Sequence, residues 1–165
     1  MKARFTPALF AHAEAVLGLL LRFDYPADAV VSRYFREHRE LGHADRAFVA
    51  ETVFAVLRRG RSLEARCAGK LSDRNRLLVA LAVTRGWSQR ELAPVLKASD
   101  EEWLAAAKAL PEAEFRPAVR CDLPDWLYDR LEAQFGADEV LSLAQALNQP
   151  APLDLRVNTL KTNRE

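Results

Sequence analysis

The sequence predicts an all-α fold, and three observations carry this prediction. Apolar residues recur at the spacing of a buried helix face through the first 110 residues. Helix-capping residues, prolines and glycines divide this pattern into segments of helical length. The alternation of apolar and polar residues that is typical of a strand first occurs near the end, over Leu153–Asn158. Half of the 165 residues are hydrophobic, which is enough for a buried core.

The segment Asp45–Arg59 is predicted to be the central helix of the bundle. Its apolar residues lie on nearly all sides of a helix, and only Glu51 interrupts them before the final arginines. Because a helix that is apolar all round needs cover all round, the other helices are expected to surround it. Gly60 follows directly and is expected to end this helix.

Two helices are predicted before this segment. The first begins at Pro7, because Thr6 offers a capping hydroxyl and proline suits the first helical position. Pro26 ends the first apolar pattern, and the second helix begins near Ala27.

Four more helices are predicted before residue 110, which makes about seven in total. Each has a capping residue, an apolar period or both, and two begin with a capping box of serine and a glutamate three residues later. They are placed at Ser62–Ala68, after Ser72 or Asp73, after Ser88 and after Ser99.

The last third of the chain is predicted to be organised differently. Residues 111–123 contain two prolines and no clear period, so they are interpreted as a linker. Two further helices follow, separated by Gly136, and then a strand over Leu153–Val157. The expected domains are therefore a helical one over 1–110, the linker 111–123, and a region 124–165 that begins an α/β unit.

A capping box at Thr162–Glu165 closes the sequence. It marks the start of a helix that the sequence does not contain, and one strand cannot form a sheet alone. The chain is therefore expected to be a piece of a longer protein in which the α/β region is truncated.

Charge is distributed unevenly, although the net charge is only +1. Between Val56 and Arg90, nine basic and two acidic residues give +7. Between Glu91 and Gln145, five basic and twelve acidic residues give −7. The first segment is therefore expected to present a cationic face.

The basic residues of the first segment are candidates for contacts with RNA phosphates, because cations on one face bind nucleic acid by neutralising charge. A second interpretation stands beside this one. In this second interpretation, the same side chains would form salt bridges to the acidic segment. Some of the arginines could also contact phosphates while others form salt bridges. The candidates are Arg58, Arg59, Arg61, Arg66, Lys70, Arg74 and Arg76.

Two parts of the sequence carry a resemblance to a known family. The string DRAFVAETVFAVLRRGRSLEA, at 45–65, resembles the helical NusB-like domain. The strings LPDWLYDRLEAQFG and ALNQPAPLDLRVNTLKTNRE, at 123–136 and 146–165, resemble the entry to the catalytic region of the RsmB/Nop2/Sun family of RNA cytosine-5 methyltransferases.

The resemblance implies a modular enzyme of ribosomal RNA. Such a protein has an N-terminal helical domain for RNA, a connecting subdomain, and a Rossmann-like domain that binds S-adenosylmethionine. The family attacks the pyrimidine with a cysteine that follows a proline, whereas Cys67 follows Arg66 and Cys121 follows Arg120. No glycine-rich loop follows a strand either. No catalytic or cofactor-binding residue is therefore assigned, and this chain alone is expected to transfer no methyl group.

Arg156, Asn158 and Lys161 lie in the family-like string near the end. Arg156 and Asn158 would project from one face of the predicted strand. They are candidates for contacting RNA or for bracing the missing catalytic domain. Bracing is favoured, because the strand must find its sheet there.

Two other functions remain open. One is a stand-alone NusB-like module that binds RNA and a ribosomal protein, such as a transcription antitermination factor. In the other, the helical domain docks mainly on its own catalytic domain. The segment from Pro124 onward favours the methyltransferase, because a free-standing seven-helix module does not need it.

Metal and membrane functions are not predicted. The three histidines share no ligand spacing with one another or with the cysteines, so no metal site is expected. The longest apolar run of the first helix, Ala15–Leu21, is too short to cross a bilayer. Two cysteines far apart suit a reduced, cytoplasmic setting.

Overall fold

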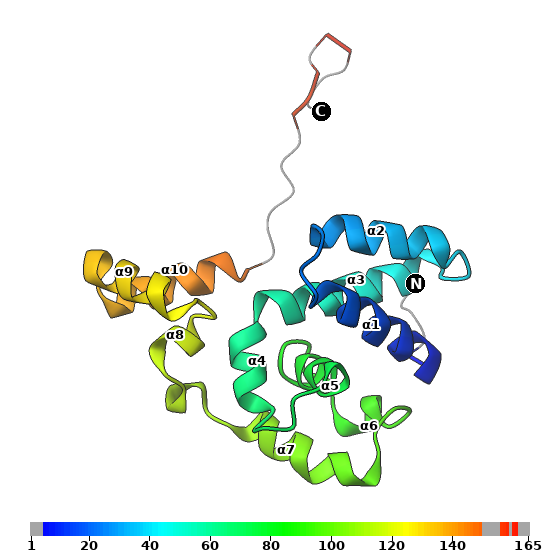
Figure 1. The fold of residues 1–165 in the computed structure, drawn as a ribbon, viewed down its shortest axis with the longest axis horizontal. Helices are drawn as coiled ribbons and strands as arrows, with labels where there is room; N and C mark the ends of the chain where they lie inside the picture. The colour runs from blue at the N-terminus through cyan, green and yellow to red at the C-terminus, as the bar shows by residue number, and fades with distance from the viewer. Residues whose placement is uncertain (1–4, 150–155, 159, 162–165) are drawn as a thin grey trace.

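The computed structural model describes residues 5–149, 156–158 and 160–161, and all regular structure within these ranges is helical (Figure 1). The predicted all-α fold is confirmed. None of the described helices is long and apolar enough to cross a membrane. Two 3-10 turns, η1 (Ala98–Asp100) and η2 (Glu112–Glu114), accompany the α-helices. The α-helices are α1 (Pro7–Leu20), α2 (Ala27–Glu37), α3 (His43–Arg58), α4 (Gly60–Arg66), α5 (Asp73–Val83), α6 (Gln89–Leu92), α7 (Glu101–Ala109), α8 (Pro117–Arg120), α9 (Asp125–Phe135) and α10 (Ala137–Leu147).

Side-chain caps set the starts of several helices, as the sequence predicts. The hydroxyls of Thr6, Ser72 and Ser88 each accept a hydrogen bond from the backbone N–H three residues later. Ser88 also completes its capping box, because Glu91 accepts a bond from its backbone N–H. The box predicted from Ser99 is not formed, since the chain turns there as η1 before α7 begins.

The most enclosed helix is α5, which corrects the expectation that Asp45–Arg59 is central. Six consecutive residues of α5, Leu77–Ala82, are buried on every side. Figure 1 views α5 nearly along its axis in the middle of the bundle, and α1, α3, α4 and α7 pack against it. In α3 the stripe that includes Val49 and Val53 is buried, but Ala50 and Ala55 remain partly exposed. The alanines count as apolar in the sequence pattern of α3, but their small side chains can stay partly exposed. Other helices therefore do not need to surround α3 on every side.

The predicted end of the Asp45–Arg59 helix is confirmed to within one residue, because α3 ends at Arg58 and Arg59 is its C-cap, but Gly60 forms no loop after it. Only Arg59, at φ −114° and ψ 31°, separates α3 from α4, and Gly60 is the first residue of α4. The helix resumes because α4 has its own apolar stripe, which buries Leu63 and leads to the buried Cys67. The chain therefore makes a corner with no loop.

A second, smaller apolar cluster is formed by α8, α9 and α10, seen at the left of Figure 1. The two helices predicted after Pro124 are confirmed, and Gly136 joins them at φ 83°. The predicted linker 111–123 contains α8, and its Ala118 and Cys121 are buried in this cluster. The cluster meets the main bundle through α4 and α8. The division into domains stays a prediction.

The predicted strand is not confirmed. Leu153 and Leu155 lie outside the described residues, as does the capping box at Thr162–Glu165. The three residues from Arg156 to Asn158 are described and have no regular secondary structure.

Candidate nucleic-acid interface

Four of the seven candidate cations are paired with carboxylates inside the protein. Three of them reach the acidic second segment, as the salt-bridge interpretation expects, and Arg76 pairs within the basic segment. The shortest N–O distances are Arg61–Asp125 2.7 Å, Arg66–Glu112 3.8 Å, Arg74–Asp100 2.7 Å, Arg76–Glu64 2.9 Å and Arg76–Asp73 3.0 Å.

Arg66 is the most deeply placed of these cations, with 4% of its surface exposed. Its guanidinium donates to the carbonyl oxygens of Ala107 and Leu110, at 3.0 and 2.6 Å, and so caps the C-terminal end of α7. Burial lowers its pKa from the ordinary value, and Glu112 opposes this shift. A phosphate has no access to this side chain in the structure, so Arg66 serves packing.

Arg74 joins α5 to the start of α7. It donates to Asp100 and to the carbonyl oxygen of Val95, both at 2.7 Å. Asp100 also accepts a bond from the backbone N–H of Lys97. Burial alone would raise the pKa of Asp100, but the hydrogen bonds from Arg74 and Lys97 lower it below its ordinary value. This ion pair is structural.

Arg61 and Ser62 fasten α4 to the second cluster. Arg61 pairs with Asp125 and donates to the carbonyl oxygen of Leu123. Ser62 donates to the carboxylate of Asp122 from its backbone N–H at 2.8 Å and from its hydroxyl at 2.9 Å. These contacts place Arg61 at the contact between the main bundle and the second cluster. Its charge is already paired with a carboxylate there.

Arg58, Arg59 and Lys70 have no hydrogen-bonded or ion-paired side-chain partner among the residues that the structure describes. Arg58 and Lys70 are exposed, and Arg59 is partly buried. Lys70 lies beyond the end of α4, away from the other two. The structure therefore leaves a smaller set of free cations than the sequence indicates.

Arg58 and Arg59 line a cleft of about 400 Å³ between the ends of α3, α5 and α10. A third cation, Arg85, lines the same cleft and was not among the predicted candidates. Arg85 belongs to the basic segment of the sequence, so charge alone was the signal that could have found it. Its guanidinium lies 2.6 Å from Glu51 and over the rings of Phe48 and Trp87. The other lining residues are Glu51, Ala55, Val83, Thr84, Glu112 and Asn148.

The chemistry of this cleft suits a few phosphate contacts. Three guanidiniums and two carboxylates line it, so its net charge is close to +1. Arginine forms bidentate bonds with phosphate oxygens, and Asn148 can both donate and accept. The two carboxylates limit how much anionic charge can enter, so this cleft fits a short stretch of backbone.

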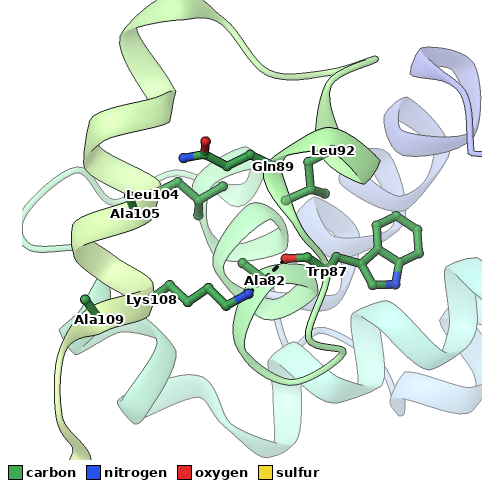
Figure 2. Close-up of a pocket in the computed structure, with 8 residues that line it drawn as sticks. All are labelled: Ala82, Trp87, Gln89, Leu92, Leu104, Ala105, Lys108 and Ala109. Atoms are coloured by element: carbon green, nitrogen blue, oxygen red, sulfur yellow. Dashed lines mark hydrogen bonds between the residues drawn. The ribbon is translucent and has the colours of Figure 1, made fainter.

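A second hollow, of about 410 Å³, lies between α5, α6 and α7 (Figure 2). Its wall is mostly apolar, and Lys108 donates from its ammonium to the carbonyl oxygen of Trp87 at 3.2 Å. Trp87 itself packs on Phe5 and Phe48 and is partly buried. Lys108 is the one ionisable side chain among the lining residues, and its ammonium already donates to a carbonyl, so no pair of catalytic groups meets in this hollow.

Both cysteines behave as core residues. Cys67 and Cys121 are buried and unpaired. Burial raises the pKa of Cys67 to about 11, and burial also raises that of Cys121. The reactive thiolate is therefore scarce at neutral pH, and neither residue is a candidate nucleophile.

Two comparisons with known proteins bear on this chain. A family model described as the RsmF/B-like methyltransferase ferredoxin-like domain matches residues 123–165. The chain is also 28% identical, over 181 aligned residues, to a Synechocystis protein named probable ribosomal RNA small subunit methyltransferase B. The resemblance to the RsmB/Nop2/Sun family is confirmed. The alignment covers 90% of this chain and 40% of the relative's length. No solved structure matches the chain.

The family-like string contains the last three candidates, Arg156, Asn158 and Lys161. All three are exposed. Asn158 organises a turn, because its side-chain oxygen accepts from the N–H of Leu160 and its carbonyl accepts from the N–H of Lys161. Contact with RNA and bracing of a catalytic domain both stay predictions for these residues.

S-adenosylmethionine stays a prediction for the parent protein. The residues that the structure describes contain no glycine-rich loop after a strand. No residue here is assigned to the cofactor.

Proposed function

We propose that this chain is the N-terminal, RNA-recognising part of an S-adenosylmethionine-dependent ribosomal RNA cytosine-5 methyltransferase. The similarity to a protein named as a ribosomal RNA methyltransferase supports the parent activity. The match over residues 123–165 favours this function over a free-standing antitermination module, which has no need for that region. S-adenosylmethionine would supply the methyl group, and it would be held by a domain beyond the residues described here. We place the protein in the cytoplasm, with RNA and its own methyltransferase domain as partners.

The observation that carries the RNA-binding role is the cleft beside Arg58 and Arg59. Most other candidate cations are neutralised by carboxylates or backbone carbonyls, whereas these two are not. Unpaired guanidiniums in a concave surface gain more from a phosphate than guanidiniums that must first break an ion pair. Arg85 reinforces the cleft by exchanging Glu51 for a phosphate oxygen when RNA binds.

The test is a salt titration of RNA affinity, measured by fluorescence anisotropy with a structured ribosomal RNA fragment. Each lost phosphate contact reduces the slope of log affinity against log salt by roughly 0.7–0.9. The double variant Arg58→Gln, Arg59→Gln should therefore flatten the slope by about 1.4–1.8 and weaken binding at low salt. Its melting temperature should fall only slightly, because neither side chain is hydrogen-bonded or ion-paired, although the charge of Arg59 favours the ionised carboxyl of Asp122 and lowers its pKa.

The double variant Arg36→Gln, Arg39→Gln is the matched control, because it removes the same charge from exposed positions at the end of α2. It should leave the slope nearly unchanged. If the control weakens RNA binding and the cleft variant does not, the RNA face lies on α2 and the cleft proposal is overturned. If the parent chain shows no affinity for RNA at low salt, the RNA-recognising role itself is overturned.

A further inference from the structure

Two histidines that are far apart in the sequence meet at one corner of the bundle. His12 lies on α1 and His38 directly follows α2, and their ring centroids are 5.1 Å apart. Glu40 lies in the turn between α2 and α3 and completes the group. One nitrogen of each ring and a carboxylate oxygen of Glu40 all lie within 4.8 Å of one another.

Both histidines point at the same carboxylate oxygen. His38 Nδ1 lies 2.9 Å and His12 Nε2 lies 3.9 Å from Glu40 Oε1. Ligand atoms around a tetrahedral zinc ion, each about 2.0–2.2 Å from the metal, lie roughly 3.4 Å from one another. The two observed distances bracket this value. All three ligand atoms lie within 4.8 Å of one another, so changes of at most about 1.4 Å in their separations would complete three of the four positions.

Tyr34 holds both rings in place. Its hydroxyl is 2.9 Å from His12 Nδ1, and its ring stacks on His38 at 4.0 Å between centroids. Tyr34 itself is buried in the main core. A hydrogen bond to the ring nitrogen that faces away from a metal is the usual way in which a protein orients a histidine ligand. Here one buried side chain orients two ligands before any ion arrives.

The place on the fold also favours a cation. His38 is the C-cap of α2, where the last carbonyls carry the negative end of the helix dipole. The three ligand side chains are partly open to solvent, with exposed fractions of 22%, 34% and 59% for His12, His38 and Glu40. This leaves a path for an ion and room for a water in the fourth position.

We propose that His12, His38 and Glu40 form a binding site for a first-row divalent cation, with Zn²⁺ the best match to a two-histidine, one-carboxylate ligand set. The ion would tie α1 to the turn that leads into α3. The role is structural, because the site fixes the corner of the helical bundle and faces neither the cleft of Arg58 and Arg59 nor the apolar hollow.

A simpler arrangement would be an ion pair between Glu40 and a protonated histidine. That arrangement uses one imidazole, whereas here two converge on one oxygen, and two imidazolium rings 5.1 Å apart would repel each other. A divalent cation satisfies both neutral rings and the carboxylate at once. The two arrangements differ in their response to zinc, which only the metal site binds.

The test is calorimetric titration of the untagged, full 165-residue chain with Zn²⁺, together with the melting temperature at increasing zinc. One ion should bind per chain, and the melting temperature should rise with zinc concentration, because a ligand of the folded state stabilises it by mass action. Replacing Zn²⁺ with Co²⁺ should give the visible absorption of a tetrahedral ion.

The variants separate a ligand role from a packing role. His38→Gln and Glu40→Gln should each weaken zinc binding by more than about tenfold while the zinc-free melting temperature stays near that of the parent, because both side chains are partly exposed. Tyr34→Phe keeps the stacked ring, removes the hydroxyl and should weaken binding by about tenfold. His43→Gln is the matched control, because His43 is exposed and outside the group.

Three outcomes would overturn the proposal. The first is a parent chain that binds no zinc at a large excess. The second is zinc affinity that survives both His38→Gln and Glu40→Gln, which would put the ion elsewhere. The third is an equal loss of affinity in His43→Gln.

Discussion

Asp122, which lies in the second cluster, caps the start of α4 in the main bundle. It accepts two hydrogen bonds from Ser62, which is sixty residues earlier in the chain. The backbone N–H of Ser62 is one of the first-turn donors that an α-helix leaves without an internal partner. A residue of the second cluster therefore supplies a cap that α4 lacks in its own sequence. This contact is polar, yet Ser62 is buried within it.

Removing the Asp122 side chain should weaken the fold more than removing only its charge. Asp122→Ala leaves the N–H of Ser62 without an acceptor and leaves its hydroxyl only the carbonyl oxygen of Arg59, at 3.3 Å, so it should lower the free energy of unfolding by about 1–3 kcal/mol. Asp122→Asn keeps an acceptor for the N–H, offers a donor to the hydroxyl and tolerates the left-handed backbone at φ 55°. Urea unfolding at neutral pH should rank Asp122→Asn at or above the parent and Asp122→Ala below both.

The same pair of variants has a predicted pH dependence. Burial raises the pKa of Asp122 despite the hydrogen bonds from Ser62. The folded state therefore holds its proton to a higher pH than the unfolded state, and stability from this group is lost as pH rises through the raised pKa. Any advantage of Asp122→Asn at neutral pH should shrink as pH falls through that value. An advantage that stays constant would mean that Asp122 carries no burial penalty.

Asp100 should show the opposite pH dependence. Its pKa is lowered in the folded state by Arg74 and by the N–H of Lys97, so its contribution is present above the ordinary pKa and is lost as pH falls through the lowered one. Asp100→Asn should cost about 1.5–3 kcal/mol at neutral pH, the usual range for charged hydrogen bonds, and much less in acid. Asp129→Asn is the control, because Asp129 is exposed on α9. Thermal unfolding across a pH series measures both, and an equal penalty at every pH would contradict the prediction.

Substitutions at Arg66 and Lys70 should distinguish the effect of a buried, hydrogen-bonded cation from that of an exposed one. Arg66→Met keeps the apolar stem but leaves the carbonyls of Ala107 and Leu110 without their donor, so it should cost about 1–3 kcal/mol in urea unfolding. Lys70→Met removes the same charge four residues later at an exposed position and should change stability by less than about 0.5 kcal/mol. Similar losses for the two variants would show that charge, rather than the buried hydrogen bonds, is what matters.

Local signals in the sequence predicted most helices correctly. The starts at Pro7, Asp73 and Gln89 follow from caps that act within three residues, so they need no knowledge of the rest of the fold. The central helix could not be found in this way. Its identity depends on which neighbours cover it, and α3 and α5 look alike when only their own residues are considered.

The candidate site was predictable only as a distribution of charge. The charges of +7 and −7 left both phosphate contacts and salt bridges open, and the structure places three salt bridges between the two segments. Arg58 and Arg66 are equivalent in sequence, and only burial makes one a surface cation and the other a cap for α7. The meeting of His12 and His38 is likewise a product of helix packing, which their spacing in the sequence does not reveal.

At the corner formed by Arg59, the number of residues between α3 and α4 matters as much as which residues they are. Each residue added to an α-helix turns everything after it by about 100°. A one-residue insertion or deletion beside Arg59 would rotate α4, turn Leu63 out of the core and swing Ser62 away from Asp122. A loop would absorb such a change, but this corner has none. Homologous chains that share this corner should therefore vary in residue type around position 59 and show no gaps there.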